Sequence, residues 1–134
     1  MMVGYSEEHK QIYPAEYLRG IELFNNEEYF ESHEAWEDIW VTTTGRVRTF
    51  YQGLIQAAVA LCHYERGNLR GALRLYKAAI EKLEGFQPEF MSLNVSDFIK
   101  QLEEFFKDVS LESEGEKKTA PRIEMIATAD EVKG

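Results

Sequence analysis

The chain has 134 residues, 44% of them hydrophobic and 13% aromatic, which is enough to bury one compact core. Its formal net charge of −9 and pI near 4.9 argue against a nucleic-acid partner, because such a protein needs a basic face to displace phosphate counterions. No apolar run approaches the roughly 18 residues of a membrane span, and no signal segment opens the chain. We therefore expect a cytoplasmic protein with no membrane partner.

Four helices are predicted over the first two thirds of the chain. The first covers 14–24, where a proline suits the first helical turn and apolar residues follow at helical spacing. The second covers about 29–41 and ends where three threonines and a glycine break the pattern. A long and mostly apolar third helix spans about 47–65, and a fourth covers 69–84 with one apolar stripe of period near 3.6.

A fifth helix is expected over about 94–109, because the short polar side chains at its start suit a helix N-cap. From Ser110 onward small and charged residues dominate, which is typical of mobile chain. Residues 121–126 nevertheless carry enough apolar side chains to dock on the body or on a neighbouring subunit. We predict a single helical domain over 1–109 and a flexible or docking C-terminal tail over 110–134 that adds little stability.

No β-type alternation of useful length appears, so the predicted fold class is all-α, a compact bundle of about five helices. A faint internal echo relates 24–29, before the second helix, to 64–69, before the fourth. Each segment precedes a helix across a tight turn that contains Asn or Gly, as in helix pairs of the tetratricopeptide kind. We expect helix-pair packing of that type, although two units are too few for a solenoid.

The second helix carries a pattern that points to a site. His33 and Glu37 lie one turn apart on the same face, and Glu34 lies beside them. The run 33–37 resembles the helical His-Glu-x-x-His zinc motif with its second histidine replaced by glutamate. His63, from the third helix, is the candidate for a third ligand of a divalent ion such as Zn, Mn, Ni or Fe. Glu34 would then act as general base on metal-bound water.

Three polar residues interrupt the apolar third helix. Gln52, Gln56 and His63 fall within about 40° of one another around the helix axis. An unpartnered buried amide or imidazole costs on the order of 1–3 kcal/mol, so this stripe must face water or polar side chains, and the second helix offers such partners. A hydrogen bond between the two helices is expected. Further candidate members of this cluster and its aromatic neighbours are Glu31, Tyr51, Trp36 and Trp40.

The alternative is that the same polar residues form a buried network that only fixes helix register. The two tryptophans are then core residues, with ligand stacking as their other interpretation. A ferritin-like di-iron site is not expected, because Glu-x-x-His occurs at neither His33 nor His63.

Charges are distributed unevenly between the predicted helices. Between Gly20 and Gly45 there are seven acidic residues and no Lys or Arg. The third and fourth helices carry most of the nearby cations, namely Arg46, Arg48, Arg66, Arg70, Arg74 and Lys77. Two interpretations follow. Either the acidic helix packs beside a basic helix edge with its surplus charge solvated, or the acids form a cluster that binds a cation.

At these residues the chain resembles a known family, the small helical proteins of the domain of unknown function family DUF309. The matching segments, which together cover about 14–84, are Phe24-Asn25, 29–37, 50–58 through His63, Gly67-Asn68 and Gly71-Ala72. The resemblance implies a compact α-helical domain in which the His-Glu helix faces the Gln-Gly-Leu-Ile-Gln helix. It implies no activity, since none is assigned to the family.

Two functions remain open, and whether the protein is an enzyme is left undecided. The first is an interaction or structural module that binds another protein or a second copy of itself, with the polar network purely structural. The alternative is a small metal-dependent, hydrolase-like enzyme that uses His33, Glu34, Glu37 and His63.

Overall fold

Residues with helical periodicity form the helices that the sequence predicts. The computed structural model describes residues 5–116 and 119–127. Its five longer helices are α2 (Ala15–Asn25), α3 (Tyr29–Trp40), α4 (Gly45–Glu65), α5 (Leu69–Leu83) and α6 (Val95–Phe106). Each begins and ends within a few residues of its predicted range. The mostly helical fold is confirmed.

Shorter elements were missed. They are α1 (Glu7–Ile12), the 3₁₀ turn η1 (Glu84–Phe86) and a hairpin of two-residue strands, β1 (Glu89–Phe90) and β2 (Leu93–Asn94). Strands of this length are below what period-2 alternation can reveal. The two strands lie in the connector between α5 and α6 and reverse the direction of the chain before α6 begins.

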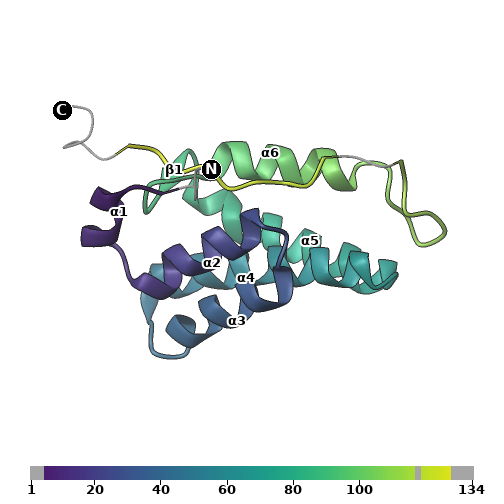
Figure 1. The fold of residues 1–134 in the computed structure, drawn as a ribbon. Helices are drawn as coiled ribbons and strands as arrows, with labels where there is room; N and C mark the ends of the chain where they lie inside the picture. Colours follow the sequence, from purple (N-terminus) through teal and green to yellow (C-terminus); the bar gives the residue numbers. More distant parts are fainter. Residues whose placement is uncertain (1–4, 117–118, 128–134) are drawn as a thin grey trace.

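The helices pack in pairs, as expected. α4 lies between α3 and α5 and contacts both along their lengths, while α2 packs along α3. α6 lies on the side of α2 and α4 that is opposite α3 (Figure 1). In the part of the chain that the structure describes, no helix is both long and apolar enough to cross a membrane.

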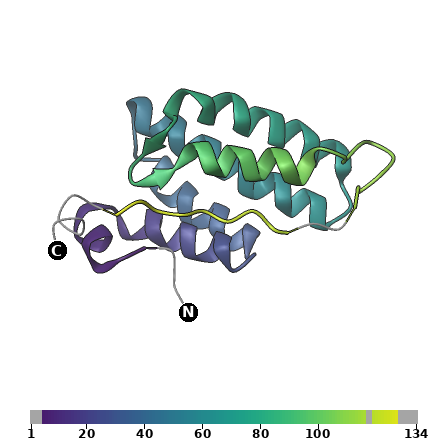
Figure 2. The same cartoon turned by 90° about the horizontal axis from the view of Figure 1, so that it is seen from above.

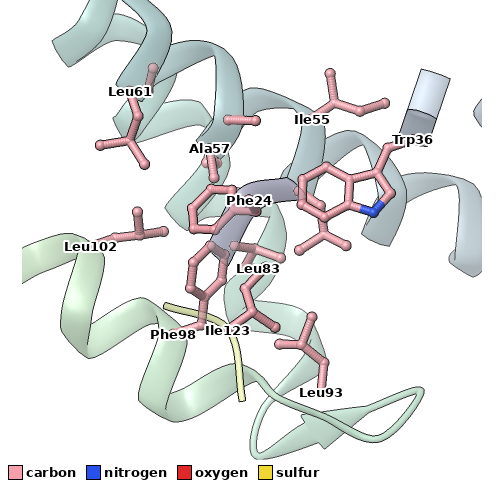
Figure 3. Packing of buried hydrophobic residues seen from close by; sticks show 14 of the residues in the cluster. Phe24, Trp36, Ile55, Ala57, Leu61, Leu83, Leu93, Phe98, Leu102 and Ile123 are labelled. Atoms are coloured by element: carbon pink, nitrogen blue, oxygen red, sulfur yellow. The ribbon is translucent and has the colours of Figure 1, made fainter. Parts of the chain in front are cut away.

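The core is centred on large aromatic residues from α2, α3 and α6 (Figure 3). Phe24 lies 6.0 Å from Trp36 and 5.3 Å from Phe98 between ring centroids, and all three side chains are fully buried. Trp36 requires a glycine opposite it, because a Cβ at Gly20 would lie 2.1 Å from the indole Nε1. That nitrogen donates instead to the Tyr17 carbonyl at 3.1 Å. Trp36 is therefore a core residue and is not exposed for ligand stacking.

The segment 119–127 runs between α2 and α6 (Figure 2). Ile123 is 1% exposed and belongs to the core. The Asn25 amide donates to the Ile123 carbonyl at 2.9 Å and accepts from its N–H at 2.7 Å. Of the two alternatives for the tail, this segment adopts the docked one. The division into a domain over 1–109 and a tail over 110–134 stays a prediction.

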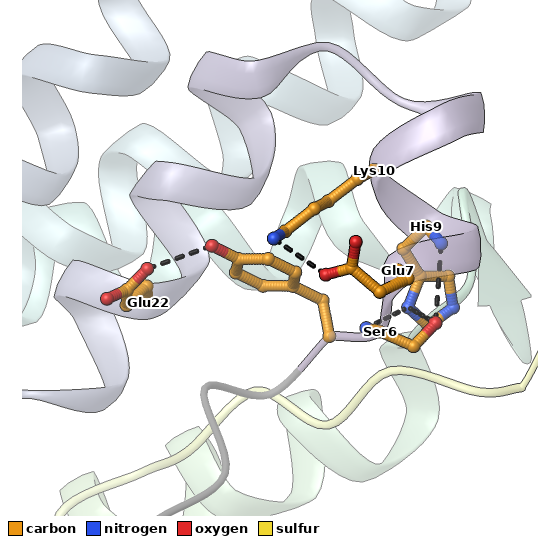
Figure 4. Close-up of polar contacts among 6 residues, drawn as sticks. Ser6, Glu7, His9, Lys10 and Glu22 are labelled. Carbon is orange, nitrogen blue, oxygen red and sulfur yellow. Dashed lines mark hydrogen bonds and ion pairs between the residues drawn. The ribbon is translucent and has the colours of Figure 1, made fainter.

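Helix α1 holds the same segment from its other end. Ser6 and His9 form a reciprocal capping box, and His9 Nε2 donates to the Ile126 carbonyl at 2.9 Å. Tyr5 adds a hydrogen bond to Glu22 of α2 at 2.9 Å (Figure 4). The six residues of α1 lack an apolar stripe, so periodicity could not predict this helix.

Candidate functional site

His33 is held by residues of its own helix. Its Nδ1 donates to the Phe30 carbonyl at 2.6 Å, and its Nε2 lies 3.6 Å from Glu37 Oε1. The Phe30 ring packs edge-on against the imidazole, with centroids 5.0 Å apart. The histidine side chain is 17% exposed and the Glu37 side chain 51%, so this pair lies at the surface. Local neighbours thus hold the ring: Phe30 accepts from Nδ1, and Glu37 lies within ion-pair distance of Nε2.

His63 is engaged elsewhere, at the turn that joins α4 to α5. The Asn68 amide nitrogen lies 3.2 Å from His63 Nδ1, while its amide oxygen accepts from the Gly71 N–H at 3.0 Å and so caps α5. His63 therefore supports the start of α5. This role follows from a contact five residues away in sequence.

The predicted metal ligands do not come together. Within residues 5–116 and 119–127, no group of three or more His, Cys, Asp or Glu side chains is arranged to hold a metal ion. His33, Glu37 and His63 are accordingly not a ligand set in this structure. The physical reason is that each histidine contacts neighbours of its own segment, His33 through Phe30 and His63 through Asn68. Glu34, the predicted general base, is an exposed side chain of α3.

The polar stripe of α4 lies half-buried where predicted, but it is not bonded to α3. Gln52, Gln56 and His63 are each of intermediate exposure. Among the described residues, no hydrogen bond joins them to His33, Glu34 or Glu37, so the expected bond between the helices is absent. Gln56 Oε1 is buried without a partner in this part of the chain.

Tyr51 and Glu31, the other predicted members of the polar cluster, differ in exposure. Tyr51 is 2% exposed and packs 5.8 Å from Tyr17 between ring centroids; burial raises the pKa of its phenol. Glu31 is exposed to solvent. Neither shares a site with the histidines.

Trp40 closes the C-terminal end of α3 together with Arg48. The guanidinium lies 3.8 Å from the centre of the Trp40 ring and donates to the carbonyls of Trp40 at 2.9 Å and Thr43 at 3.2 Å. A cation near the last carbonyls of a helix opposes the negative end of its dipole. Trp40 and Arg48 therefore stabilise a helix end.

A second feature of the surface is a row of cations, which we call the basic ridge. It consists of four exposed residues in the α4–α5 turn and on α5, namely Arg66, Arg70, Arg74 and Lys77. On α5, spacings of four and three residues keep Arg70, Arg74 and Lys77 within about 60° around the helix axis. In the described part of the chain, ion pairs within 4.0 Å join only residues three or four apart in sequence, and none includes the ridge. Its charges are thus not neutralised by the acids of α3.

A hollow that the sequence analysis did not single out lies near the end of α4. Its volume is about 330 Å³, and its lining residues are Glu27, Tyr29, Leu61, Tyr64, Glu65, Phe105 and Ala120. They come from the turn before α3, from α3, α4 and α6, and from the docked tail. The only signal in the sequence was the echo between 24–29 and 64–69, which contains both tyrosines and both glutamates.

Comparison with known proteins gives a family but no activity. Residues 17–75 match the model of a family described as "Domain of unknown function (DUF309)", which confirms the resemblance found in the sequence. An uncharacterized protein of Aquifex aeolicus is 26% identical over 104 residues, which cover 77% of this chain and 30% of that protein. The uncharacterized protein YpuF of Bacillus subtilis is 37% identical over 75 residues, which cover 54% of this chain and 43% of that protein. The chain thus spans less than half the length of either relative.

Proposed function

Residues 17–75 of this chain match the model of the DUF309 family, and from this premise we propose that the chain is an interaction module whose basic ridge binds an acidic segment of another protein. The observation that carries the proposal is that four exposed cations in one row have no carboxylate within 4.0 Å among the described residues. In a chain of net charge −9, acids were available to pair with them.

The dimensions of the ridge suit a short peptide. From Arg70 to Lys77 helix α5 advances seven residues, which corresponds to about 10 Å along a helix. An extended segment of about three to four residues spans that distance. Arg side chains can bind carboxylates through two parallel hydrogen bonds, so alternating acidic residues would match the row.

The binding energy should be modest. Exposed ion pairs contribute about 0.2–1 kcal/mol each, so four of them supply at most about 4 kcal/mol. Phe30 is 44% exposed and lies 5.8 Å from the Arg66 guanidinium, so an apolar residue of the partner could add about 1.5–3 kcal/mol by packing on it. The sum corresponds to a dissociation constant no tighter than about ten micromolar.

The overall charge favours a peptide over a long polyanion. The exposed acids of α3 and the net charge of −9 repel any anion that extends beyond the ridge. A short acidic segment with an apolar residue avoids most of that repulsion. A nucleic acid that extends beyond the ridge would meet this repulsion along its length.

Fluorescence anisotropy with a labelled peptide of alternating Glu and Leu residues tests this proposal. The variant Arg70→Glu/Arg74→Glu should weaken binding at least tenfold, and binding of the unmodified protein should fall as salt rises. Arg19→Glu/Lys100→Glu is the matched control, because it reverses two exposed cations outside the ridge and should leave the affinity within twofold.

Three outcomes would contradict the proposal. They are equal loss of binding in both variants, binding of a single-stranded RNA of the same charge more tightly than the peptide, and no binding at millimolar peptide. Circular dichroism of both variants checks that the helices are retained.

A further inference from the structure

The hollow near the end of α4 lies between the start of α3 and the end of α4. Glu27 lies in the turn before α3 and Tyr29 is the first residue of α3, while Tyr64 and Glu65 are the last two residues of α4. Both pairs place one phenol and one carboxylate on the same hollow. A volume of about 330 Å³ falls within the range of small-molecule sites.

Tyr29 is the buried polar side chain of this site. It is 4% exposed and its ring is fixed by Phe24, 5.1 Å away between centroids. Among the described residues its hydroxyl has no hydrogen-bond partner, whereas the Tyr64 hydroxyl donates to the Glu114 carbonyl at 2.9 Å. The Tyr29 phenol, in a wall of the hollow, is therefore available to a ligand.

The carboxylates of Glu27 and Glu65 both lie close enough to the Tyr29 phenol to affect its ionisation. Burial is the main cause that raises the pKa of Tyr29, and the charges of Glu27 and Glu65 raise it further. Burial also raises the pKa of Glu65, again with a contribution from Glu27, while Arg66 acts in the opposite direction. Two like charges are thus held near one buried hydroxyl.

The remaining walls are aromatic and aliphatic. Tyr64 and Phe105 meet edge to face with centroids 4.9 Å apart, and Leu61 and Ala120 complete the lining. Aromatic faces attract cations, and aliphatic side chains suit the hydrocarbon stem that carries one. The lining thus has negative charge, a free hydroxyl and an apolar surface together.

We infer that this hollow binds a primary ammonium or guanidinium group carried on an aliphatic stem. Glu27 and Glu65 would pair with the cation, the Tyr29 oxygen would accept one of its N–H groups, and Leu61, Tyr64 and Phe105 would contact the stem. A calcium ion is a poorer match to this donor set, because Ca²⁺ takes six to eight oxygen ligands, more than two glutamates and one phenol supply. The cation can belong to a free amine or to a Lys or Arg side chain of another protein.

Two-dimensional amide NMR with the full chain tests the inference. The ligands are butylammonium and butylguanidinium chloride for free cations, and a capped Ala-Lys-Ala peptide for a side chain, each compared with NaCl at the same ionic strength. Saturable shifts should appear at residues around the hollow. Shifts with butylammonium or butylguanidinium would show that a free cation is sufficient for binding. Shifts with the peptide alone would show that the ligand is a side chain of another protein.

Three variants separate the site from general charge effects. Glu27→Gln/Glu65→Gln should weaken binding at least tenfold, and Tyr29→Phe should weaken it severalfold while it keeps the packing of the ring. Glu28→Gln/Glu103→Gln removes the same charge from exposed positions outside the lining and should bind as the unmodified protein does. Equal shifts in the first and third variants, or shifts that NaCl reproduces, would overturn the inference.

Discussion

The outer face of α3 and the seam between α2 and the docked tail are held by contacts of different range. On α3, His33 is bonded to a carbonyl three residues before it and lies beside a carboxylate four residues after it. At the seam, Asn25 is bonded to Ile123, 98 residues away. The first region has the richer sequence motif, and the second does more to join the chain into one body. A dense motif therefore does not by itself mark a site.

The largest effect is expected where the seam enters the core. Ile123→Ala should destabilise the fold by about 2–5 kcal/mol, because the side chain is 1% exposed and its removal leaves a cavity. Urea unfolding measures the change. Ile12→Ala is the matched control, since Ile12 is 57% exposed and should change stability by less than about 0.5 kcal/mol. Similar values for both variants would show that the tail does not contribute to the core.

The polar half of the seam gives the next effect. Asn25→Ala leaves the Ile123 N–H and carbonyl without their partner, at a cost of about 1–3 kcal/mol. Asn26→Ala, at the exposed neighbouring position, serves as the comparison in the same unfolding experiment. If Asn25→Ala costs no more than Asn26→Ala, the two hydrogen bonds do not hold the tail.

The face of α3 should respond much less. Glu37→Gln removes one partner of a half-exposed pair at 3.6 Å, so stability should change by less than about 1 kcal/mol. Thermal melts of the unmodified protein with Zn²⁺, Mn²⁺ and Ni²⁺ should show no stabilisation that Glu37→Gln abolishes. Such a metal-dependent difference would instead support the three-ligand site predicted from the sequence.

The smallest effect is a gain in stability at the hollow. The pKa of Glu65 is raised above its ordinary value of 4.5, so the folded state binds its proton more tightly than the unfolded state does. Ionised Glu65 therefore costs stability at neutral pH, a cost that disappears as the pH falls below 4.5. Glu65→Gln should raise the melting temperature slightly at pH 7 and not at pH 4. Glu103→Gln, at an exposed position outside the hollow, is the comparison in the same melts.

The sequence by itself determined the helices and their buried faces. Apolar residues at period 3.6 bury one stripe of a helix in almost any packing, so α2 to α6 and the core positions of Phe24 and Trp36 follow from local pattern. The turn at 66–68 follows from Gly67, because its φ of 77° suits glycine. The turn at 25–28 instead places Glu27 at a φ of 63°, which backbone preference alone does not favour.

Only the tertiary structure decided which polar groups meet. Helical spacing places His33 beside Glu37. Whether either residue faces His63 depends on how α3 and α4 are rotated about their axes and on competing local partners such as Phe30 and Asn68, and helical spacing predicts neither. The docking of Ile123 and the meeting of the start of α3 with the end of α4 at the hollow join residues far apart in the chain. Their free energy comes from burial shared among several elements, and no single segment of sequence carries that term.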